Sequence, residues 1–255
     1  MEPIDAIRML SEILSQSRRL VVFTGAGISV PSGIPDFRSA DGLYLQKEFD
    51  GVSPEEILSH SYFLKHTKRF YRFYREKMLY PDAKPNAAHQ WIASLEHTSR
   101  DVTVVTQNID GLHEAAGSSH VCQLHGTVHR NFCMHCGRPY DLSALLSQAQ
   151  KDGDGIPRCP YDGALIKPDV VLYEEPLYDE IVDDAVSAIA SADTMLIIGT
   201  SLVVYPAASF VRCFKGRHLV LINKSETPYD HMAELAVYND VIHVVRMLDS
   251  LQNGS

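Results

Sequence analysis

Four short apolar runs, separated by helical patterns, constrain the fold more than any other feature of this 255-residue sequence. We predict buried strands in these runs, at residues 20–23, 102–105, 195–198 and 219–222, and a fifth strand at 241–245. We predict helices where apolar residues recur at helical spacing, at residues 4–17, 86–96 and 178–191. Strands that alternate with helices favour a parallel sheet covered on both faces. The expected fold class is α/β, with a Rossmann-like, doubly wound parallel sheet.

Two stretches interrupt this alternation. Residues 39–84 are rich in aromatic side chains and have a helical pattern. Residues 127–167 contain three cysteines with several glycines and prolines, and they lack a long apolar run. We expect both to be insertions that form one smaller domain, with a helical part and a zinc-ribbon-like part, and a cleft between this domain and the sheet. The larger part then comprises residues 1–38, 85–126 and 168–255.

Composition narrows the choice of partners. The formal net charge of −9 argues against a nucleic-acid-binding protein, because phosphate contacts need a basic face. It suits cationic partners such as lysine-rich peptides, although a solubilising surface charge explains it equally well. No apolar run reaches the roughly 18–20 residues of a membrane span, and no secretory signal is visible at the N-terminus. The number of cysteines, five, is odd, which favours reduced cysteines in a cytoplasmic protein. From the charge and the apolar runs, we expect neither membrane nor direct nucleic-acid contacts.

A glycine-rich turn follows the first predicted strand. The sequence GAGIS places Gly25 and Gly27 where a backbone can approach a pyrophosphate closely and point N–H groups at it. One G-x-G is a weak signal, since many strand-to-helix turns contain it. The third glycine of the dinucleotide fingerprint would fall at Val30 and is absent, which disfavours an ordinary dehydrogenase.

Polar side chains follow the second predicted strand. Gln107, Asn108 and Asp110 offer neutral donors and acceptors and one carboxylate, a set that suits ribose hydroxyls and a carboxamide. A polar turn after a strand is the simpler explanation. Further on, His125 precedes a glycine, and histidine is the usual general base near neutral pH. The chain has 12 histidines, so any one of them is more often structural than catalytic.

The cysteine spacing predicts a metal site. Cys133 and Cys136 form a C-x-x-C pair, and after 22 intervening residues Cys159 is followed by Asp162 at the place of a fourth ligand. Three thiolates and a carboxylate can complete a structural zinc site, and the thiolates supply most of the binding energy. The alternative is that the metal is lost or weakly held because the fourth cysteine is missing.

The ordered set of motifs resembles the sirtuin family. GAGIS, GIPDFRS, TQNIDGLH, LHG, the cysteine pair, KPDVVLYEEPL and GTSLVVYP occur in one order over about residues 18–245, at spacings similar to those of sirtuins. The resemblance implies that residues 1–255 form a single catalytic domain with NAD as cosubstrate and a structural zinc. It implies an NAD-dependent protein-lysine deacylase, which transfers the acyl group to ADP-ribose and releases nicotinamide. Its implied partners are acyl-lysine proteins or peptides.

The resemblance also implies roles for single residues. It implies contacts with NAD for Gly25, Ala26, Gly27, Phe37, Arg38, Gln107, Gly199, Thr200, Ser201, Asn223 and, beside the adenine, Val241. It implies a pocket around the nicotinamide and its ribose for Ser29, Asn108, Ile109 and Asp110. The implied catalytic residues are His125, the general base, and Asn108. For the acyl-lysine peptide it implies Tyr71, Val170, Val171, Tyr173, Glu174 and Val203.

Three positions depart from the family pattern. Asp162 replaces a cysteine, and Val30 stands where many relatives have threonine. Relatives that prefer succinyl or malonyl groups carry a tyrosine and an arginine three residues apart. Here Tyr71 is followed by Tyr74, while Arg75 lies one residue beyond, so we expect neutral acyl groups to be favoured.

Two other functions remain open for a chain with these motifs. One is mono-ADP-ribosyl transfer, and the other is a non-catalytic module that senses NAD. The presence of His125 favours deacylation over the first. The presence of both His125 and the NID loop argues against the second.

Overall fold

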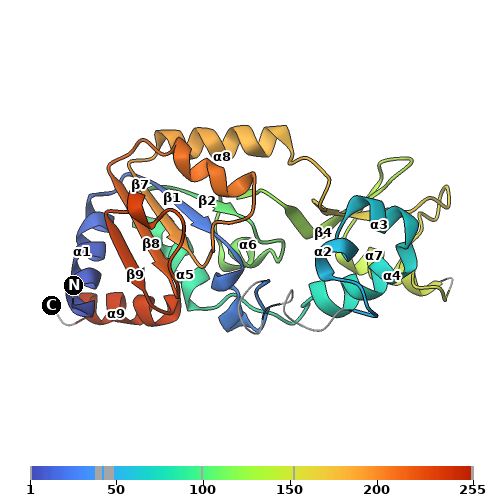
Figure 1. Ribbon diagram of the computed structural model, residues 1–255, viewed down its shortest axis with the longest axis horizontal. Helices are drawn as coiled ribbons and strands as arrows, with labels where there is room; N and C mark the ends of the chain where they lie inside the picture. Colours follow the sequence, from blue (N-terminus) through green and yellow to red (C-terminus); the bar gives the residue numbers. More distant parts are fainter. Residues whose placement is uncertain (1, 38–41, 43–48, 99, 152, 254–255) are drawn as a thin grey trace.

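The computed structural model describes residues 2–37, 42, 49–98, 100–151 and 153–253, and it contains two regions (Figure 1). We call the six-stranded sheet with its covering helices the large region. We call the three-stranded sheet with the helices packed around it the small region. Figure 1 shows them side by side along the longest axis, with both chain ends at the far end of the large region.

The large sheet is parallel throughout. Its order is β3-β2-β1-β7-β8-β9, so the direction of winding reverses between β1 and β7. The strands are β1 (Arg19–Thr24), β2 (Asp101–Thr106), β3 (Val121–Gln123), β7 (Thr194–Ile198), β8 (His218–Asn223) and β9 (Leu235–Tyr238). This is the predicted doubly wound arrangement, with the predicted runs in its four central strands.

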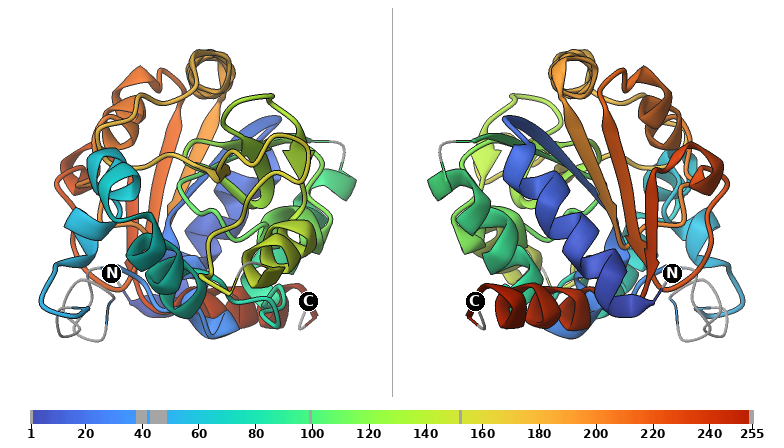
Figure 2. Two further views of the ribbon diagram at one scale, coloured as in Figure 1. Left: turned by 90° about the vertical axis from the view of Figure 1, so that its right-hand side faces the viewer. Right: turned by 90° about the vertical axis from the view of Figure 1, so that its left-hand side faces the viewer.

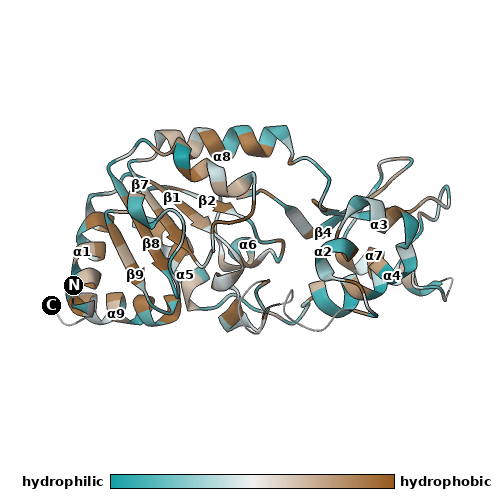
Figure 3. Cartoon of the chain, in the orientation of Figure 1, coloured by the Kyte–Doolittle hydropathy of each residue, from teal (hydrophilic) through white to brown (hydrophobic). Residues whose placement is uncertain are grey.

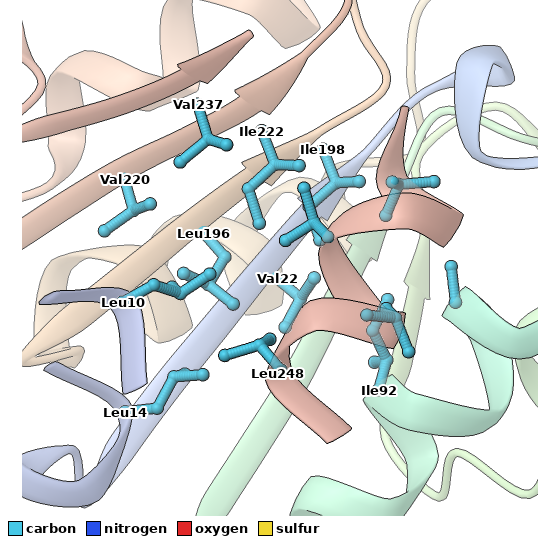
Figure 4. Packing of buried hydrophobic residues seen from close by; sticks show 14 of the residues in the cluster. Leu10, Leu14, Val22, Ile92, Leu196, Ile198, Val220, Ile222, Val237 and Leu248 are labelled. Carbon is cyan, nitrogen blue, oxygen red and sulfur yellow. The ribbon is translucent and has the colours of Figure 1, made fainter. Parts of the chain in front are cut away.

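Alternating side chains of each central strand bury two separate apolar clusters. On one face, Val22, Leu196 and Val220 pack against α1 (Pro3–Gln16), α5 (Ala87–Leu95) and α9 (Val241–Asn253), as Figure 4 and the right-hand view of Figure 2 show. On the other face, Phe23 and Ile197 pack against α8 (Asp179–Ser191) and the 3₁₀ segment η5 (Ala207–Cys213). Because both faces are covered, the strands are almost wholly hydrophobic, whereas α8 alternates in character (Figure 3).

The predicted fifth strand is wrong. Residues 241–245 open α9, where Val241, Val244, Val245 and Leu248 are buried at helical spacing. The last strand is instead β9, an edge strand that buries only alternate residues. The three-residue β3 was also missed, because so short a segment has no readable period.

The small region is an antiparallel sheet in the order β5-β4-β6. Its strands are β4 (Gly126–Cys133), β5 (Pro139–Tyr140) and β6 (Ile166–Val170), and its helices are α2 (Pro54–Ile57), α3 (His60–Lys65), α4 (Thr67–Phe73) and α7 (Leu142–Lys151). A π-helical turn, Tyr74–Met78, continues α4. We propose the expected division of the chain into two regions, with the second inserted segment at residues 126–170 instead of 127–167. The reason is that β4 and β6 both belong to the small sheet.

Aromatic side chains fill the core of the small region. Phe63, Phe70, Tyr71 and Tyr74 are buried to 1% exposure or less and contact one another edge-on or stacked. Val170 of β6 joins this cluster from the sheet side. The aromatic content of residues 39–84 therefore makes a core that their helices, each of seven residues or fewer, could not form alone. Among the described residues, no helix is both long and apolar enough to cross a membrane.

Candidate functional site

A cavity of about 890 Å³ lies at the carboxyl edge of the large sheet, where the sheet meets the small region. Its walls come from the segments that follow β1, β2, β7 and β8, and from the end of β6. The reversal of strand order between β1 and β7 leaves a crevice at this edge, which is where open α/β sheets bind ligands.

The glycine-rich turn lies against the segment after β7. The N–H of Gly27 donates to the carbonyl oxygen of Gly199 at 2.8 Å, and a Cβ on Gly27 would meet that oxygen at the same distance. Gly199 has a φ of +62°, and a Cβ there would lie 2.5 Å from the backbone nitrogen of Ile28. The glycines therefore let these two backbone segments pack directly against each other, and together they form one wall of the cavity.

The segment after β2 forms a polar network with this turn. Asn108 Nδ2 donates to the carbonyl oxygen of Gly25 at 3.2 Å and to Ser29 Oγ at 3.1 Å. Ser29 Oγ donates to Asp110 Oδ2 at 2.7 Å, and Asp110 Oδ1 accepts from the N–H of Leu112 at 2.9 Å. These bonds fix the Asn108 amide, which is 9% exposed, and hold the loop in one shape.

Two further bonds join neighbouring walls. Gln107 Nε2 donates to Thr200 Oγ1 at 3.0 Å. Asn223 Nδ2 donates to the carbonyl oxygen of Thr200 at 3.1 Å. Together they tie the segments after β2, β7 and β8 into one rim around the cavity.

His125 lies between β3 and β4, where the chain passes from the large region to the small one. Its Nδ1 is 2.9 Å from the carbonyl oxygen of Gln107, which can only accept, so Nδ1 carries the proton and Nε2 is the basic nitrogen. Burial lowers the pKa of His125 below its usual value, although the bond to Gln107 acts in the opposite direction. Because its pKa is lowered, the ring is a neutral imidazole at neutral pH and can accept a proton. It also lines the cavity.

A pair of buried histidines lies close to the glycine turn but does not line the cavity. His113 Nε2 is 3.0 Å from Thr24 Oγ1, and its ring contacts that of His89 edge-on at 4.9 Å. Burial lowers the pKa of His89 to about 4 and that of His113 to about 3. Both are therefore neutral packing groups of the large region at physiological pH.

Most of the residues predicted to bind cofactor or substrate come together at the cavity. It is lined by Gly25, Ala26, Gly27, Phe37, Gln107, Asn108, Ile109, His125, Val170, Val171, Tyr173, Glu174, Gly199, Thr200, Ser201, Asn223 and Val241. A smaller cavity of about 160 Å³ shares Asn108 and Phe37 with it and adds Ser29 and Asp110.

Two residues predicted to bind cofactor or substrate line neither cavity, and the prediction for a third stays untested. Tyr71 is fully buried in the aromatic core, where its hydroxyl donates to the carbonyl oxygen of Ile166. Val203 is 45% exposed and does not line the large cavity, whereas its neighbour Val204 does. Arg38 lies outside the described residues.

The cavity also has lining residues that sequence reasoning missed. Lys224, Ser225, Asn239 and Asp240 form its end beyond Asn223. They follow β8 and β9 at the carboxyl edge. Because we expected a strand at 241–245 and none at β9, Asn239 and Asp240 were not recognised as strand-end residues.

The predicted metal ligands converge in the small region. The ligand atoms of Cys133, Cys136, Cys159 and Asp162 all lie within 4.8 Å of one another. The Sγ atoms of Cys136 and Cys159 are 3.8 Å apart, and Cys133 Sγ is 3.5 Å from both carboxylate oxygens of Asp162. A tetrahedral zinc with bonds of about 2.3 Å to sulfur and 2.1 Å to oxygen gives separations of roughly 3.8 and 3.6 Å, so these residues fit zinc.

Comparisons with known proteins agree on one family. The model of the Sir2 family matches residues 25–206. The chain is 50% identical over 238 residues to the NAD-dependent protein deacetylase of Clostridium acetobutylicum, covering 93% of this chain and 96% of that protein. Its fold matches a Sir2–p53 peptide–NAD+ structure with a TM-score of 0.85 at 36% identity, over 98% of this chain and 99% of that one. It matches Sir2 with a deacetylated p53 peptide and 3′-O-acetyl-ADP-ribose with a TM-score of 0.86 at 36% identity, over 97% and 98%. The chain belongs to the Sir2 family.

Proposed function

We propose that this chain is an NAD-dependent protein-lysine deacylase, which moves an acyl group from lysine to ADP-ribose and releases nicotinamide. One observation carries the proposal. His125, with Nε2 as its basic nitrogen, lines the same cavity as the glycine turn and the Asn108 network. The names of the relatives, NAD-dependent protein deacetylases, support the same activity.

The cavity fits the parts of NAD in sequence. Gly25, Gly27 and Gly199 would lie along the pyrophosphate, because they line the cavity and a side chain at Gly27 or Gly199 would force apart the two backbone segments that form this wall. Asn108 and Asp110 would bind the nicotinamide and its ribose with amide and carboxylate groups. Phe37, which lines both cavities, would shield the reacting ribose carbon from water and from returning nicotinamide.

Nicotinamide would leave as the acyl oxygen of the lysine bonds to the ribose carbon in its place, and His125 would act next. Its Nε2 would take a proton from a ribose hydroxyl, which then attacks the carbon of the acyl group. The carbonyl oxygen of Gln107 would stabilise the resulting imidazolium through Nδ1. Water then releases the lysine, and the acyl group stays on ADP-ribose.

The peptide would bind between the two regions as an added strand. Val170 and Val171 continue from β6 into the cavity, and Tyr173 is 40% exposed beside them. Val203, which follows β7, is also exposed. Main-chain hydrogen bonds would then supply the affinity, with little selection of sequence.

A structural zinc held by Cys133, Cys136, Cys159 and Asp162 would cross-link the small region. When bound, it supplies four-coordinate cross-linking of chain segments and no step of the reaction. We also propose a cytoplasmic location, which is supported by the five cysteines, since none of them is in a disulfide.

The test is to incubate the protein with NAD and an acetyl-lysine peptide and to identify every product by mass spectrometry. The expected products are nicotinamide, the free-lysine peptide and O-acetyl-ADP-ribose. The same peptide without its acetyl group is the control and should leave NAD intact. ADP-ribosylated protein would favour ADP-ribosyl transfer, and the absence of turnover would favour an NAD-sensing module.

A further inference from the structure

The large cavity has two chemically different ends. One end holds His125 and Asn108, where the reacting ribose would lie. The glycine turn and Gly199 lie between the two ends, because β1 and β7, which precede them, lie between β2 and β8 in the sheet. The opposite end is lined by Lys224 and Asp240, at the carboxyl ends of β8 and β9. A dinucleotide bound in this direction therefore brings its adenosine half to Lys224 and Asp240.

Asp240 interacts with two positively charged or positively polarised groups at this end of the cavity, Lys224 and the N-terminus of α9. Its Oδ2 is 2.8 Å from Nζ of Lys224. Its Oδ1 accepts from the N–H of Ile242 at 2.9 Å, and its carbonyl oxygen accepts from the N–H of Val244, so it is the N-cap of the 13-residue α9. A lysine and a helix N-terminus would otherwise make an anion-binding site. Here the chain fills that site with its own carboxylate.

The position of this pair is held by the backbone around it. The N–H of Asn239 donates to the carbonyl oxygen of Asn223 at 2.9 Å, which joins the segments after β9 and β8. Asn239 Oδ1 accepts from the N–H of Asp240 at 2.8 Å. The carboxylate is therefore held at the cavity wall, with its side chain 37% exposed.

We propose that Asp240 selects NAD over NADP by denying the 2′-phosphate of the adenosine ribose its cationic partners. A 2′-phosphate carries close to two negative charges and would meet a carboxylate already paired with the lysine. The 2′-hydroxyl of NAD carries no charge and can donate to the same carboxylate. This inference rests on the proposed use of NAD.

The experiment compares the binding of ADP-ribose and of 2′-phospho-ADP-ribose by calorimetry, which requires no turnover. The wild-type protein should bind ADP-ribose about 100-fold more tightly, since juxtaposed like charges cost several kcal/mol. Asp240→Asn keeps a good N-cap but removes the charge. This variant should lower the preference for ADP-ribose over 2′-phospho-ADP-ribose by at least about 10-fold, because Lys224 and the N-terminus of α9 can then bind the 2′-phosphate.

Three companion variants make the result specific. Asp240→Glu keeps the charge and should keep the preference. Adding Lys224→Ala to Asp240→Asn should remove the gain in phosphate binding. Asp5→Asn removes an exposed carboxylate of α1, 3.7 Å from Arg8, that does not line the cavity, so it should leave the ratio unchanged. High ionic strength should weaken the gain.

The outcomes separate this inference from the proposed function. A wild-type protein that binds neither NAD nor ADP-ribose would overturn the proposed function. A protein that binds ADP-ribose, but whose preference is unchanged in Asp240→Asn, overturns only the role of Asp240. Equal binding of the two ligands to the wild-type protein would also overturn the role of Asp240.

Discussion

The large and small regions are stabilised in different ways. In the large region, two apolar clusters lie on opposite faces of one sheet, and each strand contributes to both. In the small region, the aromatic core includes Val128 of β4 and Val170 of β6. The cluster around the cysteines contains four buried residues, and two of them are Cys133 and Cys159. The comparison teaches that the large region can fold from hydrophobic burial alone, whereas the cysteine part of the small region needs a metal in place of a core.

His125 marks the point at which the regions meet. Its ring bonds to Gln107 of the large region, while its carbonyl oxygen accepts from the N–H of Val171, just after β6. Next to it, Gly126 has a φ of +74°, and a Cβ there would lie 2.0 Å from the carbonyl oxygen of Asp169. The base is thus held by both regions.

The largest effect should come from this junction. His125→Ala should lower the deacylation rate by about 10²- to 10⁴-fold, because it removes the general base. Binding of NAD should stay within a few-fold, since the glycine turn and the Asn108 network remain. Single-turnover kinetics and calorimetry measure the two quantities. Deacylation at a near wild-type rate would remove His125 from the mechanism.

Acid should weaken the large region through its buried histidines. The pKa of His89 and of His113 is lower in the folded chain than the usual 6.5, so the unfolded chain binds more protons below that value. Stability is therefore complete above pH 6.5 and is lost as the pH falls toward about 4 and about 3. One pKa unit corresponds to about 1.4 kcal/mol, so several kcal/mol are at stake.

Urea unfolding at a series of pH values measures this slope. His113→Gln should flatten it below pH 6.5. His97→Gln, which changes an exposed side chain, is the control and should not. An unchanged slope in His113→Gln would show that the buried pair does not limit acid stability.

Truncating one core residue in each region should sharpen the contrast. Leu196→Ala in β7 should lower the free energy of unfolding of the whole protein by about 2–5 kcal/mol, because it leaves a cavity at the centre of the sheet. Phe70→Ala should cost a similar amount but mainly speed hydrogen exchange in α3 and α4. Equal exchange effects in both regions would show that they unfold as a single unit.

Metal removal should act only on the small region. We expect close to one zinc per chain by metal analysis, and a chelator should destabilise the protein by about 3 kcal/mol. That corresponds to roughly 6–12 °C in Tm for a chain of this size. Asp162→Cys should slow zinc loss to the chelator, since a thiolate replaces a carboxylate. A folded, active, metal-free protein with an unchanged Tm would contradict the metal's structural role.

The smallest effect concerns the acyl group. Tyr74 carries no positive charge, and Arg75 donates to the carbonyl oxygen of Gly155 and lines neither cavity, so neither offers a cation to an acidic acyl group. On one peptide, kcat/KM should be at least about 10-fold higher for acetyl than for succinyl lysine, because an unpaired carboxylate is costly to bury. A preference for succinyl would show that Arg75 or another residue supplies the charge.

The same contrast explains what the sequence could predict. The four central strands are buried on both faces, so each appears as an unbroken apolar run. The strands of the small region lack this signal. In β4 the exposed residues His129 and Arg130 lie between buried ones, and a register shift interrupts its pairing with β6. The apolar run at 241–245 led to the wrong prediction of a strand, because four of its five residues are apolar although the segment forms the start of α9.

The residues around the candidate site divide similarly. Gly25, Asn108 and His125 stand in compact motifs, which the chain order alone reveals. The bond between Lys224 and Asp240 joins residues 16 positions apart, and it exists only because β8 and β9 end side by side. The burial of Tyr71 follows from the packing of α4 against the small sheet, which no motif encodes.

The backbone contact between Gly27 and Gly199 has a consequence for mutational tolerance. Gly117 and Gly137 have positive φ, as Gly199 does, but a Cβ there would meet nothing within 4 Å, so asparagine can replace them at modest cost. At Gly27 and Gly199 the obstacle is a neighbouring backbone that cannot move aside. In a saturation library selected for folded protein, we expect substitutions at 117 and 137 to persist, while every substitution at 27 and 199 is depleted.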